Sequence, residues 1–87
     1  MKNQQSLKQY EVVLFNDSTH SFDQVLVLLS LVLRKNPSEL VETVQYIHDL
    51  GQWTVTQCHF ELAETIYNEL KQCGLKVKLV PIKKESE

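Results

Sequence analysis

The sequence predicts an α+β domain, a sandwich of element order β-α-α-β-α-β in which a three-stranded antiparallel sheet is covered on one face by three helices. Short β-branched or alternating segments are separated by longer segments of helical periodicity. Capping residues precede two of these longer segments. The chain has 87 residues, of which 43% are hydrophobic, and this suffices for one domain with one modest core.

The first part of the chain predicts a strand, a loop and a helix. Tyr10–Phe15 is β-branched and aromatic, which is typical of a strand, and six polar residues follow it as a loop. Ser21 and Gln24 have the spacing of a capping box, so a helix is expected from there to about Arg34 and Lys35. This helix is apolar nearly all round. It is therefore either buried on most sides or leaves an exposed patch for a partner.

A second helix is predicted between Asn36 and Gly51. Asn36 can cap it, Pro37 suits its first position, Glu39 lies three residues after the cap, and Gly51 permits a left-handed exit. One face of this helix is expected to carry Leu40, Val44, Ile47 and His48.

The remaining elements are a strand, a helix and a strand. Gln52–Gln57 alternates apolar and polar residues, Cys58–Cys73 has helical periodicity, and Leu75–Leu79 alternates again before Pro81 ends the ladder or marks an edge. The third helix is expected to turn inward Phe60, Ala63, Tyr67 and Leu70. The domain should span residues 10–82, between a short flexible extension at 1–9 and a flexible tail at 83–87.

Composition excludes several classes of function. The net charge of −2 and the dispersed basic residues argue against nucleic acid as a partner. The longest apolar run, Val25–Leu33, is half the length needed to span a bilayer, and Met1–Gln9 is too polar for a signal peptide. Cys58 and Cys73 lack framework spacing, so reduced thiols and a cytoplasmic location are expected.

Catalytic patterns are weak. Two glycines far apart cannot form a phosphate loop, and no histidine has a paired metal ligand at helical spacing. We therefore expect no metal and no cofactor. A nucleophile pair of Cys58 and His48 has no supporting spacing, so an enzyme is the least favoured class.

A better constellation involves Asn16, Asp17 and His48. The first two stand at the exit of the first strand, and His48 lies at the margin of a helix face. Three acceptors that converge beside Val25, Val44 and Ile47 would suit a primary ammonium with an apolar side chain, as in a polypeptide N-terminus. Taken separately, Asn-Asp also fits simple turn chemistry, and a single histidine fits a satisfied core residue.

The combination resembles the ClpS family of adaptors, over about residues 10–82. The resemblance rests on Tyr10-Glu-Val-Val-Leu-Phe-Asn16-Asp17, Phe22-Asp23-x-Val25, Ile47-His48-x-x-Gly51 and Glu61-Leu-Ala-Glu64-Thr65. It implies the fold predicted above and a non-catalytic, monomeric adaptor of an ATP-dependent Clp protease. Such an adaptor binds N-degrons, substrates with a free N-terminal Leu, Phe, Tyr or Trp, and hands them to a ClpA- or ClpC-type AAA+ unfoldase.

The resemblance also implies residue roles. The α-amino group would contact Asn16, Asp17 and His48. The hydrophobic pocket would comprise Phe22, Val25, Val44, Ile47 and Val77, with Phe22 at a position where many members carry a gating methionine. The unfoldase would dock on Glu61, Glu64 and Thr65.

The chain departs from the family pattern at four places. Ser18 replaces a usual second aspartate, His20-Ser21 replaces a common Thr-Pro, Ile66 stands where a lysine often follows the docking segment, and the extension at 1–9 is short. The alternative is an interaction domain resembling the ribosomal stalk C-terminal domain, without N-degron binding. The two hypotheses differ in whether Asp17 is needed for binding.

Overall fold

The computed structural model describes residues 8–82 and shows the predicted order of elements. The elements are β1 (Gln9–Phe15), α1 (Phe22–Leu33), α2 (Pro37–Leu50), β2 (Gln52–His59), α3 (Phe60–Gln72) and β3 (Val77–Pro81). Most of the predicted extension and the predicted tail, residues 1–7 and 83–87, lie outside the described residues.

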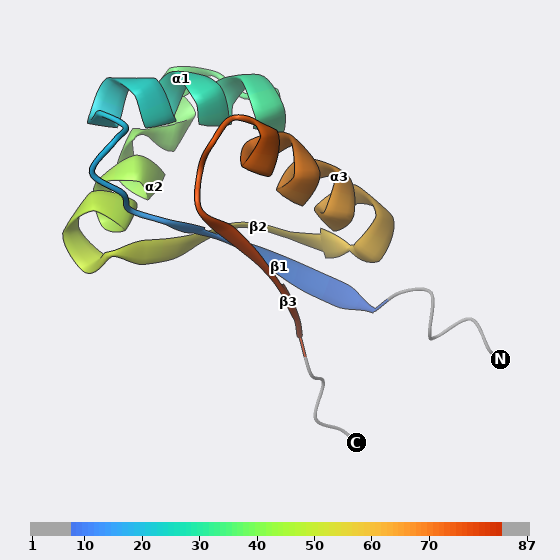
Figure 1. Cartoon of the computed structure of the whole chain (residues 1–87). Coiled ribbons are helices and arrows are strands. Elements are labelled where there is room, and N and C mark those ends of the chain that lie inside the picture. The colour runs from blue at the N-terminus through green and yellow to red at the C-terminus, as the bar shows by residue number, and fades with distance from the viewer. Residues whose placement is uncertain (1–7, 83–87) are drawn as a thin grey trace, which may run out of the picture.

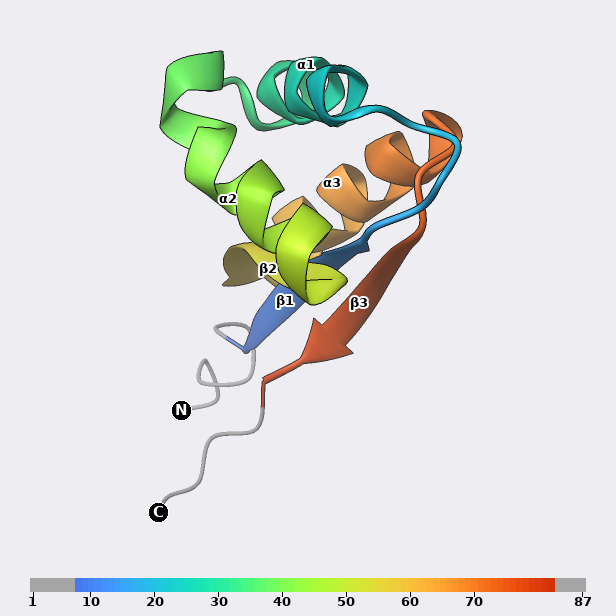
Figure 2. The same cartoon turned by 90° about the vertical axis from the view of Figure 1, so that its left-hand side faces the viewer.

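The three strands form one antiparallel sheet in the order β2-β1-β3. All three helices lie on the same face of this sheet, with α1 farthest from it (Figure 1; Figure 2). The central strand is the most buried, and Val12 and Leu14 have no exposed surface. This arrangement confirms the predicted fold class.

The core lies between the sheet and the helices. Every element except β2 and β3 contributes side chains to this core, and Leu75, which follows α3, also belongs to it. The buried cluster comprises Val12, Leu14, Leu29, Leu40, Val44, Ile47, Ala63, Ile66, Leu70 and Leu75. Three of these, Leu40, Val44 and Ile47, are the apolar residues predicted for the inner face of α2, whereas His48 of that face is exposed.

Helix ends follow the sequence signals with one exception. The Ser21 hydroxyl accepts a hydrogen bond from the Gln24 backbone N–H at 3.1 Å, and the Gln24 side chain accepts one from the Ser21 N–H at 2.8 Å, which confirms the capping box. Gly51 ends α2 with φ of 92°, in the left-handed region. Asn36 is the N-cap residue of α2 as predicted, but its side chain makes no capping bond, and its carbonyl accepts from the Glu39 N–H.

The predicted boundary between the second strand and the third helix is wrong by two residues. Cys58 and His59 belong to β2 because β1 begins at Gln9 and pairs with them, Tyr10 opposite Cys58 and Gln9 opposite His59. The buried face of α3 is also shifted, since Ile66 is 7% exposed and belongs to the core, whereas Phe60 is 41% exposed.

The last strand begins at Val77, two residues later than predicted. Leu75 is buried, but its N–H donates to the Leu70 carbonyl at 3.3 Å, so the residue still belongs to the turn that closes α3. Pro81 is the last residue of β3. This strand lies at the edge of the sheet, where proline is tolerated because it has no N–H to donate to a neighbouring strand.

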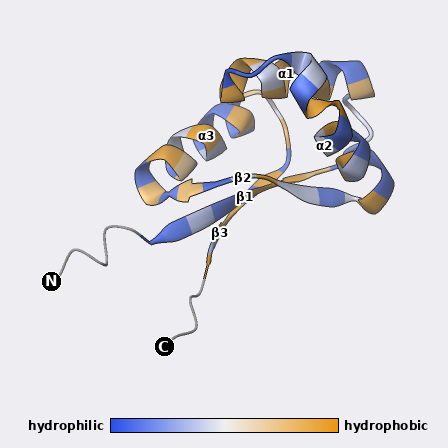
Figure 3. Ribbon diagram, turned by 180° about the vertical axis from the view of Figure 1, so that it is seen from behind, coloured by the Kyte–Doolittle hydropathy of each residue, from blue (hydrophilic) through white to orange (hydrophobic). Residues whose placement is uncertain are grey.

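The nearly all-apolar helix α1 is not buried on most sides. Leu29 is its one fully buried residue, whereas Val27 and Leu31 are 52% and 69% exposed. The ribbon of α1 accordingly includes several residues of high hydropathy (Figure 3). Within residues 8–82, no helix has the length and apolar character needed to cross a membrane.

Candidate functional site

A pocket of about 360 Å³ opens between the β1–α1 loop, the start of α1 and the second half of α2. This volume is near the lower end of the range of about 300–1,000 Å³ that is usual for small-molecule sites. Its lining residues are Asn16, Asp17, Ser18, His20, Ser21, Phe22, Val25, Val44, Ile47 and His48.

The pocket brings together seven of the eight residues predicted for substrate binding. Polar Asn16, Asp17 and His48 line it together with apolar Phe22, Val25, Val44 and Ile47. Val44 and Ile47 are each 2% exposed and belong to the core, so the core itself closes one side of the pocket.

Val77 is the exception, and its predicted place in this pocket is corrected. It lies in β3 and lines a different hollow, where Lys71, Lys76 and Lys78 are among its neighbours. The strand pairing explains this, because Val77 is opposite Leu14, on the far side of β1 from β2. The first pocket is instead formed by the loop beyond β1 and by α1 and α2.

Backbone hydrogen bonds fix the start of the loop. The Phe15 N–H donates to the Lys76 carbonyl at 2.9 Å, and the Asn16 N–H donates to the Gly51 carbonyl at 2.9 Å. The second bond ties the loop to the residue that ends α2. Asn16 is thereby held next to the end of the helix that carries His48.

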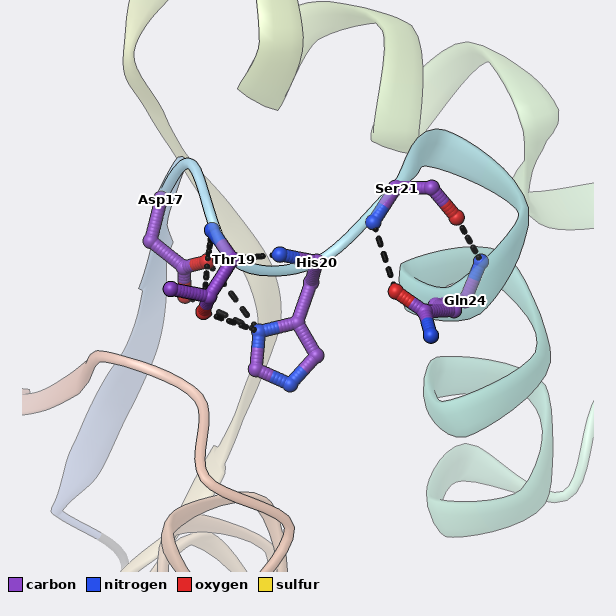
Figure 4. A network of polar contacts seen from close by, with 5 residues as sticks. All are labelled: Asp17, Thr19, His20, Ser21 and Gln24. Atoms are coloured by element: carbon purple, nitrogen blue, oxygen red, sulfur yellow. Dashed lines mark hydrogen bonds and ion pairs between the residues drawn. The ribbon is translucent and has the colours of Figure 1, made fainter.

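The Asp17 carboxylate organises the loop that follows (Figure 4). Its Oδ1 accepts hydrogen bonds from the Thr19 N–H at 2.9 Å, the Thr19 hydroxyl at 2.9 Å and the His20 N–H at 3.0 Å. The His20 Nδ1 lies 3.1 Å from Oδ1 and 3.3 Å from Oδ2. Because a carboxylate can only accept, these contacts favour a proton on Nδ1.

These donors also set the charge state of Asp17. The hydrogen bond from the His20 side chain lowers the pKa of the Asp17 carboxyl to about 2, burial opposes this, and the Thr19 donors add to the lowering. Asp17 is therefore a carboxylate over the whole physiological range. Its side chain is 8% exposed, and Oδ2 has no other hydrogen-bond donor among residues 8–82, so this oxygen has capacity for another donor.

His48 presents a different environment from His20. It is exposed in the last turn of α2, and within the described part of the chain its ring makes no hydrogen bond. An imidazole nitrogen in this setting can accept a hydrogen bond from a ligand in the pocket. Asn16, also exposed, adds an amide oxygen to the same rim.

The inner part of the network was not predicted from the sequence. The sequence shows Ser18, His20 and Ser21 as departures from the family pattern, but it does not predict the contact between His20 and Asp17. A local signal for it exists. An aspartate that follows a strand often accepts hydrogen bonds from residues two and three positions later, and Thr19 and His20 occupy these positions.

The predicted docking residues lie on another element. Glu61, Glu64 and Thr65 are exposed on α3 at spacings of three and four, which place them on one helix face. The Thr65 hydroxyl donates to the Glu61 carbonyl at 3.0 Å. Ile66, which stands where a lysine often follows this segment in the family, is buried in the core and is not available to a partner.

The structure offers little support for catalysis at Cys58. Burial raises the pKa of the Cys58 thiol, opposed by a hydrogen bond with Thr56, so the reactive thiolate is disfavoured. His48 lies near the end of α2, where β2 begins, and Cys58 is six residues beyond the start of β2. At the rise of a β-strand, this separates Cys58 from the His48 end by roughly 20 Å. Residues 8–82 contain no group of three His, Cys, Asp or Glu side chains that could hold a metal ion.

Comparison with known proteins gives one family. The family model described as ATP-dependent Clp protease adaptor protein ClpS matches residues 5–78. Among solved structures, the chain is similar to Agrobacterium tumefaciens ClpS2 bound to L-phenylalaninamide, with 27% sequence identity and a TM-score of 0.76. The match covers 86% of this chain and 98% of that one. No protein of curated function matches the sequence significantly.

Proposed function

Because the chain belongs to the ClpS family of ATP-dependent Clp protease adaptor proteins, we propose that its pocket binds the N-terminal residue of a substrate polypeptide. The substrate is an N-degron with a free α-amino group and a bulky hydrophobic first side chain. The chain acts on it without catalysis. The observation that carries the proposal is the single pocket in which Asn16, Asp17 and His48 adjoin an apolar wall.

The polar side of the pocket suits an ammonium group. Asp17 supplies a negative charge, Asn16 an amide oxygen and His48 a ring nitrogen, and all three accept hydrogen bonds. An α-ammonium has three N–H donors, so it can satisfy all three at once. A blocked N-terminus has lost both the charge and most of the donors.

The apolar side suits the first side chain. Phe22 and Val25 are partly buried, and Val44 and Ile47 are core residues, so a hydrophobic group between them would leave water. L-phenylalaninamide, the ligand of the similar ClpS2, is a phenylalanine whose carboxylate is replaced by an amide, and this supports the same kind of ligand here. The rigid Phe22 ring should influence which of Leu, Phe, Tyr or Trp fits best.

The expected affinity is modest. Burial of a Leu or Phe side chain contributes about 1.5–3 kcal/mol, and each charge-assisted hydrogen bond contributes about 1.5–3 kcal/mol. Association and ordering cost several kcal/mol of this sum. A dissociation constant of about micromolar order follows. Such a complex releases its cargo readily, as an adaptor must.

The second half of the proposed function is delivery to a ClpA- or ClpC-type unfoldase. Glu61, Glu64 and Thr65 are exposed on α3, which contributes no residue to the pocket, so one molecule can hold substrate and unfoldase together. We expect replacement of Glu61 and Glu64 by alanine to weaken binding to the unfoldase's N-terminal domain and to leave peptide binding unchanged. Calorimetric titration of that domain measures the first effect.

Fluorescence anisotropy tests peptide binding directly. Short peptides that begin with Leu, Phe, Tyr, Trp or Ala carry the dye at the C-terminus, and each has an N-acetylated control. We expect binding of the free bulky N-termini and none of the acetylated or Ala peptides. Affinity should also fall as pH rises past about 8, where an α-amino group loses its proton. Equal binding of free and acetylated peptides would exclude the proposal.

The alternative, an interaction domain without an N-degron pocket, is separated by Asp17→Ala. We expect this variant to lose peptide binding, whereas Asp49→Ala, which removes an exposed carboxylate at the end of α2, should retain it. Peptide binding that survives in a folded Asp17→Ala protein would favour the alternative.

A further inference from the structure

We propose that His20 is a positioning residue for the bound α-amino group, and that only its neutral form leaves the charge of Asp17 available to the ligand. The inference rests on the proposed function and extends it to a residue without a role there. It predicts that the affinity for an N-terminus falls on acidification as well as above pH 8.

The His20 ring lies between the Asp17 carboxylate and the turn that follows α3. Its Nδ1 contacts both oxygens of Asp17, at 3.1 and 3.3 Å, and both residues line the pocket. The opposite edge of the ring faces the turn after α3, where a Cβ on Gly74 would lie 3.8 Å from Cε1 and 3.9 Å from Nε2. The imidazole is 18% exposed, so it is held between that turn and the carboxylate.

The two charge states of this ring have opposite consequences for a ligand. A neutral imidazole with a proton on Nδ1 donates one hydrogen bond, orients the carboxylate and leaves its negative charge intact. An imidazolium adds a positive charge about 3 Å from the same carboxylate. The ammonium of a substrate then competes with an internal cation for one anion and also meets a like charge across the pocket.

Other ionisable groups lie on the elements around His20. Asp17 is its direct partner, and Asp23 lies in the first turn of α1. Lys71 and Lys76 are the basic residues that flank the turn at Gly74. His48 is a second histidine that lines the same pocket, so its contribution has to be separated by experiment.

The test measures the dissociation constant of a peptide with N-terminal Phe from pH 5.5 to 7.5. His20→Asn keeps a side-chain N–H donor for Asp17 but does not titrate. We expect wild-type affinity to fall by a factor of roughly five to ten more than that of His20→Asn over this range. His59→Asn, at an exposed histidine outside the pocket, should follow the wild type. The acid loss that remains in His20→Asn is the contribution of His48.

Two further readouts distinguish positioning from a merely structural role. His20→Ala should weaken binding at pH 7.5, and His20→Asn should restore most of it, with both proteins folded by circular dichroism. Calorimetry at pH 6 in buffers of different ionisation enthalpy should show more proton release on binding by wild type than by His20→Asn.

The possible failures are distinguishable. Identical pH profiles and identical proton release in wild type and His20→Asn would overturn the role of His20 while leaving N-degron binding in place. Absence of any binding by folded wild-type protein at pH 7.5 would overturn both proposals.

Discussion

Replacement of Asp17 by asparagine removes the charge of the loop carboxylate and keeps its size and one acceptor oxygen. In the folded protein, the His20 hydrogen bond lowers the pKa of Asp17 from the usual 3.8 to about 2, against the effect of burial and with the help of Thr19. One pKa unit corresponds to 1.36 kcal/mol, so the shift is equivalent to about 2 kcal/mol of folding stability. Because the loop lies at the surface and is screened by solvent, we expect Asp17→Asn to cost about 1–1.5 kcal/mol at pH 7.

The pH dependence gives the sharper test. A carboxyl with a pKa lowered in the folded state contributes stability that is complete above its unfolded pKa and is lost as pH falls through the folded value. The contribution of the Asp17 carboxyl to the difference between wild type and Asp17→Asn should therefore be complete at about pH 5, fall to about half near pH 3 and nearly vanish near pH 2.

Urea denaturation followed by circular dichroism measures this difference at each pH. At pH 7, the melting temperature should also fall by roughly 5–10 °C for a domain of this size. The control is Asp49→Asn, because the exposed Asp49 accepts a bond only from Gln45 among residues 8–82, and its loss should change stability by less than about 0.5 kcal/mol. An Asp17→Asn protein that differs from wild type by the same amount at pH 7 and pH 3 would refute the reasoning.

Two further predictions concern the scaffold around the site. In α1, Leu29→Ala should cost about 2–5 kcal/mol in urea denaturation because Leu29 is fully buried, whereas Leu31→Ala should cost less than about 0.5 kcal/mol because Leu31 is 69% exposed; equal costs would contradict the packing described. Ser21→Ala breaks the capping box and should cost about 1 kcal/mol, and Ser21→Asp should retain most of the stability as an alternative cap. If alanine and aspartate were equivalent at this position, the cap would contribute nothing.

The order of the elements was predictable because local signals and tertiary packing agree along most of the chain. The capping box at Ser21 and the left-handed exit at Gly51 depend on neighbouring residues, and both are present in the structure. The alternation predicted for Gln52–Gln57 is not, because Trp53 is 38% exposed and the pairing of β1 with β2 shifts register between Val12 and Val13. The errors occur where a distant segment decides. Cys58 extends β2 because Tyr10 lies opposite it, which no local pattern in the residues around Cys58 reveals.

The periodicity of α3 misled for a related reason. The sequence has apolar residues on more than one side of this helix. Helical spacing therefore also allows the predicted inner face with Phe60 and Tyr67. The structure buries Ile66 and places Phe60 at the rim, where its ring packs against Tyr10 with centroids 5.1 Å apart and the ring planes tilted by 59°. The sheet surface under the helix selects the face, and all three strands contribute to this surface.

Most of the residues that line the site were predicted from the sequence, but their contacts were not. The family resemblance identified residues of the loop, α1 and α2 that the fold then gathers around one pocket, but it also included Val77, which the strand order carries to another hollow. The resemblance does not show which groups donate hydrogen bonds to Asp17. The donors come from Thr19 and His20, and at His20 this chain departs from the family pattern.

That engagement resolves an apparent conflict in the proposed function. The Asp17 carboxylate is already bonded to its own loop, but its two oxygens are used unequally. Oδ1 accepts three hydrogen bonds, from the Thr19 N–H, the Thr19 hydroxyl and the His20 N–H. Among residues 8–82, Oδ2 has only the contact with the His20 ring at 3.3 Å. The loop bonds therefore fix the orientation of the charge before a ligand arrives, which lowers the ordering cost of binding. It follows that weakening the loop bonds should reduce affinity even where Oδ2 itself is untouched.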